Sequence, residues 1–280
     1  MEIITDPKEM QQRALTAKRA GQRIAFVPTM GYLHAGHLSL LQEGRQRGDL
    51  LVLSIFVNPT QFGPNEDLAS YPRSLESDCE LARAAGTDLV FVPAASALYP
   101  PAASTWVNVE GLTEVLCGAS RPQHFRGVTT VVTKLFNLVQ PDLALFGCKD
   151  FQQLAVIRRM VRDLDIPVEI VGMPIVREGD GLALSSRNVY LAPGERQQAL
   201  VLSRAIATAR QLVANGEEDV DAILAVLLAL ISGMPDARID YLQICHQGTL
   251  QEQKKVDSDS VLLLALFIGK TRLIDNSFLL

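Results

Sequence analysis

Residues 24–37 read IAFVPTMGYLHAGH, and residues 38–41, LSLL, then open a helical pattern. The apolar run at 24–27 is typical of a buried β-strand. A strand, a glycine-bearing turn and the start of a helix therefore follow one another. In that geometry the backbone N–H groups and the positive end of the helix face an anion. The stretch predicts a phosphate site at the end of this strand.

Two histidines lie at the start of the predicted helix. His34 and His37 are three residues apart, so the helix places them near one another and lets both reach phosphate oxygens. A metal ligand or a surface residue without a function fits the same four-residue pattern. The motif alone leaves these alternatives open.

The composition of the chain is that of a globular protein. It has 280 residues, of which 48% are hydrophobic and 20% charged, and its formal net charge at pH 7 is -5. This length fits one large domain or two modest ones. A net negative charge gives no general attraction to nucleic acid or acidic lipid. We therefore expect no nucleic acid and no membrane as a partner.

Signals for export or membrane insertion are weak in this sequence. Residues 1–6, MEIITD, lack the basic region and the long apolar core of a signal peptide. The apolar run at 261–268 is too short to span a bilayer. The four cysteines lack Cys-x-x-Cys spacing, which indicates free thiols rather than a zinc site or a disulfide framework. We expect a cytoplasmic protein.

Apolar runs and helical patterns alternate along the first part of the chain. The runs typical of strands are 24–27, 50–57, 89–92, 143–146 and 168–171. The helical patterns are 38–47, 74–85, 128–139 and 151–164. Continuous apolar strands separated by helices predict an α/β fold, with a Rossmann-like, doubly wound parallel sheet covered on both faces.

Polar clusters follow three of these predicted strands. His34 follows the first strand, NPTQ at 58–61 the second, and GCKD at 147–150 a later one. Ligands of parallel sheets bind beyond the carboxyl ends of the strands, at a topological switch point. We therefore expect the three clusters to lie together at one edge of the sheet.

The pattern changes near residue 175. Residues 176–188 are polar and contain glycine, and helical stretches at 193–215 and 219–231 precede alternating segments at 238–244 and 260–268. We expect two domains, a Rossmann-like domain at 1–175 and a smaller α+β domain at 176–280.

Six longer blocks follow one another along the chain. They are PTMGYLHAGH at 28–37, SIFVNPTQF at 54–62, RPQHFRGV at 121–128, GCKDFQQ at 147–153, DGLALSSRN at 180–188 and RLIDN at 272–276. In this order they closely resemble the pantothenate synthetase (pantoate–β-alanine ligase) family of the nucleotidylyltransferase superfamily. The likeness covers nearly the whole chain and is far more specific than His-x-Gly-His alone.

The resemblance implies an activity and a set of ligands. Members of the family condense pantoate with β-alanine while ATP is cleaved to AMP and pyrophosphate, through a pantoyl-adenylate intermediate. Mg²⁺ is expected because ATP reacts as its magnesium complex. The resemblance also implies that the Rossmann-like domain binds ATP and pantoate, that the C-terminal domain acts as a lid, and that the protein is a homodimer.

The resemblance assigns catalysis to two histidines and a lysine. His34 and His37 bind the triphosphate and stabilise the transition state, with His37 as the principal residue, and Lys149 offers a cation to phosphate oxygens. Pantoate supplies the nucleophile, so the protein supplies positioning and charge stabilisation. The helix end lowers the pKa expected of a histidine there, and phosphates raise it. The sequence leaves the net direction open.

The resemblance also implies which residues bind the nucleotide. They are Met30, His34, Gly36, His37, Gly147, Lys149, Asp150, Val176, Leu184, Ser185, Ser186 and Arg187. Alone, the pair at 149–150 would be interpreted as a surface ion pair and the serines at 185–186 as a helix cap. Within the family blocks, the hydroxyls and the guanidinium of 185–187 suit a mobile loop that closes over phosphate.

Two glutamines are assigned to pantoate, Gln61 and Gln153, and Gln61 is also placed near β-alanine. A neutral amide orients a carboxylate and hydroxyls and leaves the carboxylate nucleophilic. A lysine in its place would quench the nucleophile. Arg121 and His124 either border the pocket or serve a structural role.

Acidic residues give no metal site from the sequence. Asp67, Asp78 and Asp88 are interpreted as solvated surface charges, and the protein ligands of Mg²⁺ stay unknown. Among the departures from the family, Cys148 replaces a common glutamate or glutamine, and Gln123 replaces a frequent glycine. We expect Cys148 to make the pocket sensitive to thiol reagents.

Two other functions fit the histidine motif. A nucleotidyltransferase would transfer AMP to a phosphate acceptor, and a non-catalytic sensor would bind ATP without turnover. AMP release that depends on a carboxylate and on β-alanine separates a ligase from the first alternative. His34, His37, Lys149 and Arg187 argue against the second.

Overall fold

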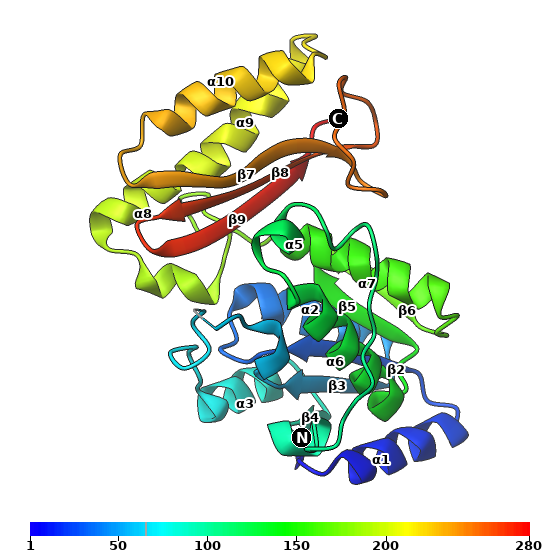
Figure 1. Cartoon of the computed structure of the whole chain (residues 1–280). Helices are drawn as coiled ribbons and strands as arrows, with labels where there is room; N and C mark the ends of the chain where they lie inside the picture. The colour runs from blue at the N-terminus through cyan, green and yellow to red at the C-terminus, as the bar shows by residue number, and fades with distance from the viewer. Residues whose placement is uncertain (65) are drawn as a thin grey trace.

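The structure is a computed structural model that describes residues 1–64 and 66–280, and in these residues it forms two β-sheets (Figure 1). The larger sheet has the strand order β1-β4-β3-β2-β5-β6, and all its neighbouring strands are parallel. Its strands are β1 (Glu2–Ile4), β2 (Ile24–Thr29), β3 (Leu50–Ile55), β4 (Leu89–Phe91), β5 (Leu143–Gly147) and β6 (Glu169–Met173). The predicted α/β class is confirmed.

Helices cover both faces of this sheet. On one face lie α1 (Pro7–Arg19), α6 (His124–Val139) and α7 (Phe151–Asp163). On the other face lie α2 (Ala35–Arg47) and α3 (Leu75–Ala84). Successive side chains of a strand point to opposite faces, so Phe26 packs with the first group and Val27 with the second. Burial on both faces explains why the strands read as unbroken apolar runs.

The direction of winding changes between β2 and β5. From β2 the chain moves outward through β3 and β4, and from β5 it moves outward through β6 in the other direction. β2 and β5 are neighbours in the sheet, with Ala25 paired to Leu143. The switch point therefore lies beyond Thr29 and Gly147, at the edge where the sequence predicts a ligand.

A smaller antiparallel sheet has the order β7-β8-β9. Its strands are β7 (Ala237–His246), β8 (Ser260–Ile268) and β9 (Thr271–Phe278), and its helices are α8 (Pro193–Ala199), α9 (Val201–Ala214) and α10 (Val220–Ser232). Leu262 and Leu264 of β8 face these helices, whereas Val261 and Leu263 pack against the core of the larger sheet. The predicted smaller α+β unit is confirmed. We propose residue 175 as the boundary between the two domains.

Some elements differ from the sequence prediction. The helix predicted at 193–215 is two helices that meet at Leu200, and the sequence pattern does not predict β1 or β9 as a strand. β1 has three residues and β9 mixes charged and apolar ones, so neither gives a strand pattern. Short helical turns complete the described part: η1 (Pro59–Gln61), α4 (Ala95–Leu98), α5 (Cys117–Ser120), η2 (Cys148–Asp150) and η3 (Ser186–Tyr190).

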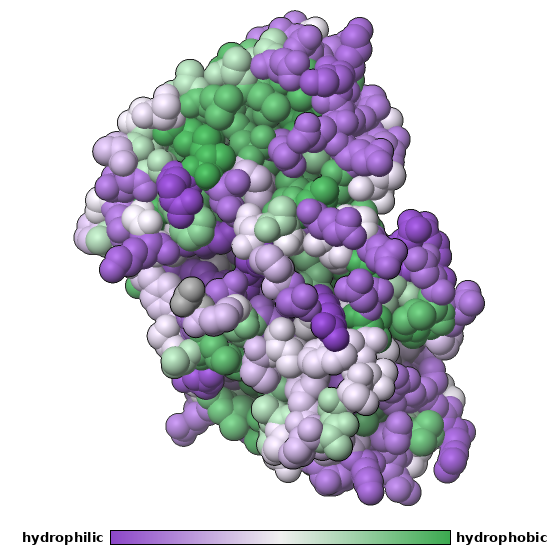
Figure 2. Space-filling view, viewed as in Figure 1, coloured by the Kyte–Doolittle hydropathy of each residue, from purple (hydrophilic) through white to green (hydrophobic). Residues whose placement is uncertain are grey.

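The surface of the smaller domain carries a group of hydrophobic side chains. Figure 2 shows them over α9 and α10, where Val226 and Leu228 are exposed. Among the residues that the structure describes, no helix combines the length and the apolar character needed to cross a bilayer.

Candidate active site

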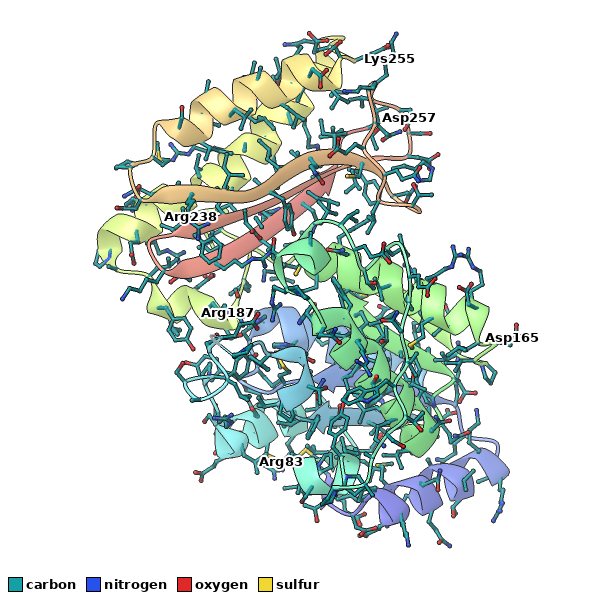
Figure 3. The ribbon with its side chains drawn as sticks, viewed as in Figure 1. Arg83, Asp165, Arg187, Arg238, Lys255 and Asp257 are labelled. Atoms are coloured by element: carbon teal, nitrogen blue, oxygen red, sulfur yellow. The ribbon has the colours of Figure 1, made fainter. Side chains whose placement is uncertain are left out.

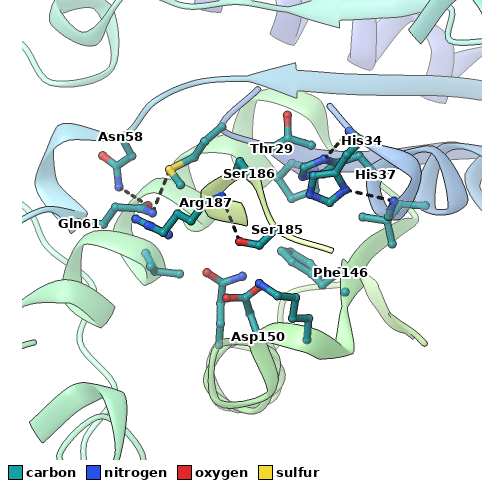
Figure 4. A pocket seen from close by; sticks show the side chains of 18 of the residues that line it. Thr29, His34, His37, Asn58, Gln61, Phe146, Asp150, Ser185, Ser186 and Arg187 are labelled. Atoms are coloured by element: carbon teal, nitrogen blue, oxygen red, sulfur yellow. Dashed lines mark hydrogen bonds between the residues drawn. The ribbon is translucent and has the colours of Figure 1, made fainter. Parts of the chain in front are cut away.

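A cavity of about 260 Å³ opens beyond the carboxyl ends of β2 and β5 (Figure 4). All of the site residues predicted from the sequence line it. They are Met30, His34, Gly36, His37, Gln61, Arg121, His124, Gly147, Lys149, Asp150, Gln153, Val176, Leu184, Ser185, Ser186 and Arg187. The structure therefore brings together residues from five of the six sequence blocks, at the switch point.

A buried carboxylate holds the turn at residues 29–37, which we call the histidine corner. Asp78 of α3 is 2% exposed, and it accepts the backbone N–H of Tyr32 at 2.9 Å and of Leu33 at 2.7 Å. Gly31 has a φ of +84°, which disfavours a side chain, and a Cβ there would lie only 2.9 Å from Asp78 Oδ2. Both the backbone conformation and the close contact therefore require glycine. The interpretation of Asp78 as a solvated surface charge is wrong.

The two histidines cap helix α2 and thereby fix their own tautomers. His34 Nδ1 accepts the backbone N–H of Gly36 at 3.1 Å, and His37 Nδ1 accepts the backbone N–H of His34 at 3.3 Å. The proton of each neutral ring therefore sits on Nε2. The ring centroids are 4.1 Å apart, and a Cβ at Gly36 would lie 2.9 Å from His34 Cε1. Glycine at position 36 lets the His34 ring fold over the helix end.

Burial keeps both imidazoles neutral. The pKa of His37 is lowered to about 3, mainly by burial and also by the neighbouring His34 and Lys149. Burial likewise lowers the pKa of His34 to about 4, with Lys149 as the next cause. On balance the protein's own groups therefore lower both pKa values, and the raising effect of bound phosphates stays a prediction. At neutral pH each ring offers an Nε2–H donor without a positive charge.

Lys149 stands on the η2 turn that follows β5. Burial lowers the pKa of its ammonium group, and the charge of Asp150 opposes that shift. The ammonium group has no hydrogen bond or ion pair to any residue that the structure describes. A half-buried cation of this kind is best stabilised by an anion in the cavity.

Amide side chains occupy the end of the cavity opposite the histidines, as Figure 4 shows. Asn58 is 1% exposed, and its Nδ2 donates to Gln61 Oε1 at 3.1 Å and to the carbonyl of Gly127 at 3.1 Å. Gln61 Nε2 lies 3.1 Å from Met30 Sδ. Asn58 therefore sets which end of the Gln61 amide faces each neighbour. The sequence predicts that the cluster at 58–61 lies at this edge, but its pattern assigns no ligand or partner to Asn58 itself.

Arg121 and His124 hold the backbone of Gln61. Arg121 Nη2 donates to the carbonyl of Gln61 at 3.2 Å, and its Nε donates to Glu66 Oε1 at 2.7 Å. His124 Nδ1 lies 2.8 Å from the same Gln61 carbonyl. Burial lowers the pKa of His124 to about 4, so the ring is neutral and its proton is on Nδ1. Both residues border the pocket and also support it.

The loop at residues 185–190, for which the resemblance implies a lid role and which we call the lid loop, is attached to the larger domain by side-chain contacts. Arg187 Nε and Nη2 lie 3.0 and 2.9 Å from the two carboxylate oxygens of Asp67. The hydroxyls of Ser186 and Tyr71 are 3.4 Å apart. Figure 3 shows Arg187 between the two domains. Asp67 is therefore a partner of the lid loop and not a solvated charge.

Three further residues named from the sequence lie outside the cavity. The thiol of Cys148 lies against Gly172 of β6, where a Cβ would be 3.1 Å from Sγ, and it does not line the cavity. The expectation that Cys148 sensitises the pocket to thiol reagents is therefore not supported by its position. Asp88 is a surface residue, 2.6 Å from Arg45 Nη1. Gln123 has a φ of 74°, which explains why glycine suits that position.

Comparisons with known proteins agree with one another. A protein-family model described as pantoate-beta-alanine ligase matches residues 2–278. The pantothenate synthetase of Syntrophotalea carbinolica is 61% identical over 280 residues, which are 100% of this chain and 99% of that protein.

Solved structures give the same result. The crystal structure of pantothenate synthetase from Thermus thermophilus is 46% identical, with a TM-score of 0.94 over 100% of this chain and 99% of that one. A pantoate-β-alanine ligase from Francisella tularensis, complexed with β,γ ATP and β-alanine, is 31% identical. Its TM-score is 0.81 over 100% of this chain and 98% of that one.

Proposed function

The chain belongs to the pantoate–β-alanine ligase family, and on this premise we propose that the cavity at the switch point is where ATP activates pantoate. The reaction joins pantoate to β-alanine with ATP as co-substrate. One observation carries the assignment of the site. The His34 and His37 imidazoles and the Asn58 and Gln61 amides lie at opposite ends of a single cavity, which Lys149 and Arg187 also line.

In the first step, a carboxylate oxygen of pantoate attacks the α-phosphorus of ATP and pyrophosphate leaves. Negative charge shifts onto the leaving phosphate oxygens, so catalysis depends on donors and cations held in advance. We assign this role to the Nε2–H groups of His34 and His37, to the N-terminus of α2 and to the ammonium group of Lys149. The neutral histidines act as hydrogen-bond donors, and His37 is the principal residue.

Pantoate occupies the amide end of the cavity in this proposal. Gln61 and Gln153 orient its carboxylate and hydroxyl groups, and Asn58 keeps the Gln61 amide in one orientation. Val128 and Val131 of α6 line the same cavity, and they offer an apolar wall to the two methyl groups of pantoate.

ATP spans the remaining part of the cavity. The backbone N–H of Leu184 donates to the carbonyl of Val176 at 3.0 Å, so these two residues form one wall for the adenosine. Gly147 and Asp150 also line the cavity, and we assign them to the nucleotide. Arg187 reaches the phosphates when it releases Asp67.

Mg²⁺ enters this site as part of the MgATP complex. No group of three or more His, Cys, Asp or Glu side chains suited to a metal ion comes together among residues 1–64 and 66–280. We propose that the phosphates and water hold the ion, as is usual for Mg²⁺ in ATP-dependent enzymes.

In the second step, the deprotonated amine of β-alanine attacks the carbonyl carbon of pantoyl-adenylate. An amide bond forms, the bond between the carbonyl carbon and the phosphate oxygen breaks, and AMP leaves. A homodimer and a cytoplasmic location, both implied by the family, complete the proposal. Sedimentation equilibrium measures the first, and the four free cysteines fit a reducing compartment.

Pyrophosphate release tests the proposed function directly. With ATP and pantoate alone, we expect a burst of about one pyrophosphate per site, since the adenylate stays bound; adding β-alanine turns the burst into continuous turnover. His37→Ala should slow the burst by about 100- to 1,000-fold, because a transition-state donor is lost. Full activity of a folded His37→Ala protein would contradict the assignment. Release with a phosphate acceptor in place of pantoate would indicate a nucleotidyltransferase, and no release would indicate a sensor.

A further inference from the structure

A side chain of the smaller domain holds the turn that carries Lys149. Asn276 of β9 is 7% exposed, and its Nδ2 donates to the carbonyl of Cys148 at 3.0 Å and to the carbonyl of Lys149 at 2.9 Å. These carbonyls belong to the peptide groups on either side of the Lys149 Cα. One amide group therefore fixes both peptide planes from which the lysine side chain projects.

Asn276 is itself held by an ionic contact. Its backbone N–H donates to Asp275 Oδ1 at 2.9 Å, and Asp275 is 2% exposed. Arg177 donates to both oxygens of Asp275, at 2.7 and 2.8 Å, and also to the carbonyl of Gly181 at 3.0 Å. Residues 177–183 form a short hairpin that leads into the lid loop. A continuous set of contacts therefore runs from this hairpin through β9 to the Lys149 turn.

We propose that Asn276 is a positioning residue that aligns the ammonium group of Lys149 with the phosphates of ATP. This inference rests on the role of Lys149 in the proposed function. A lysine side chain is long and flexible, and the Lys149 ammonium group has no partner among the described residues that would direct it. Its direction is therefore set by the backbone of η2, which Asn276 restrains.

A second hydrogen bond across the same domain boundary provides a control for the loss of a domain contact. Ser120 Oγ of α5 donates to Asp240 Oδ1 of β7 at 2.8 Å. This bond also joins the two domains, but it contacts neither Lys149 nor the lid loop. Ser120 is exposed and makes one such bond, whereas Asn276 is buried and makes two, so the double variant with Lys149→Ala is what separates positioning from tethering.

The experiment measures the pyrophosphate burst with ATP and pantoate in four proteins: Asn276→Ala, Ser120→Ala, Lys149→Ala and the Lys149→Ala/Asn276→Ala double variant. We expect Asn276→Ala to slow the burst by about tenfold or more, because a misplaced group loses transition-state contacts. Ser120→Ala should change it by less than about twofold. The double variant should equal Lys149→Ala, since Asn276 acts through that lysine.

Each other outcome has a defined meaning. Equal effects of Asn276→Ala and Ser120→Ala would overturn the inference, as would losses that multiply in the double variant. Full activity of Lys149→Ala would instead reject the proposed role of the lysine, which keeps the two failures apart. If circular dichroism shows that Asn276→Ala is unfolded, Asn276→Asp replaces it. That variant keeps the shape of the side chain and removes its N–H donors, and a burst like that of Ser120→Ala would again overturn the inference.

Discussion

The histidine corner and the lid loop face the same cavity, but they are held in different ways. The corner depends on backbone N–H groups that donate to a carboxylate with 2% exposure. The lid loop depends on the Arg187–Asp67 ion pair, whose side chains are 30% and 25% exposed. Breaking the first kind of contact leaves buried donors unsatisfied, whereas a part-exposed ion pair exchanges readily with water or another anion. The corner is preformed, and the lid loop is exchangeable.

The largest expected effect comes from adding one methyl group to the corner. Gly36→Ala places a Cβ 2.9 Å from His34 Cε1, which displaces the ring. We expect the rate of adenylate formation to fall by about 100-fold, because a shift of about 1 Å in a catalytic group has that cost. The matched variant is Gly179→Ala before the lid loop, where nothing lies within 4 Å of a Cβ. Similar rates for the two variants would show that the corner is as adaptable as the loop.

The next effect concerns the carboxylate that supports the corner. Asp78→Asn keeps the size of the side chain but replaces one carboxylate oxygen by an NH₂ group. That group cannot accept the backbone N–H that the oxygen accepted. One buried N–H is left unsatisfied, so we expect the free energy of unfolding to fall by about 2 kcal/mol. Urea denaturation measures it. An unchanged midpoint would mean that the corner does not depend on Asp78.

Acid should weaken the corner through His37. Its pKa is about 3 in the folded protein and 6.5 as the ordinary value, so between these values only the unfolded chain binds the proton. The stability that the neutral ring contributes is therefore lost as the pH falls below about 6.5. Between about pH 6.5 and about pH 5, protonation of His37 in the unfolded chain lowers the free energy of unfolding by about 2 kcal/mol. Urea denaturation at both pH values measures it, and His37→Asn should show a correspondingly smaller decrease.

The smallest effect belongs to the lid loop. Asp67→Asn removes the anion that occupies Arg187, so we expect the KM for ATP to fall by about two- to fivefold with little change in thermal stability. Steady-state kinetics and a thermal melt measure both quantities. A higher KM would mean that Asp67 orients Arg187 for the nucleotide, and the two regions would then be less different than we conclude.

The sheet and the residues of the cavity could be predicted because their signals are local. Apolar runs indicate the strands, and polar blocks follow directly where strands end. The role of Asp78 escapes such reasoning because its partners lie on a loop far away in the sequence. A signal is nevertheless present, since Asp78 is next to Cys79 and four residues before Ala82, on the buried face of α3.

The contribution of β9 is beyond sequence reasoning for a similar reason. RLIDN stands out as a block, but nothing in it indicates a strand or a partner. Asn276 acquires its role only when β9 pairs with β8 and meets the Lys149 turn. The Arg187–Asp67 pair likewise depends on how the two domains meet.

The uncharged rings of the histidine corner also influence how the leaving group departs. A dipole holds an oxyanion only at contact distance, whereas a full charge attracts it across several layers of solvent. In the proposed function, pyrophosphate that has moved away from His34 and His37 is retained mainly by the charges of Lys149 and Arg187. When Arg187 pairs again with Asp67, its charge is neutralised, so we expect the acid on the facing loop to help release the pyrophosphate.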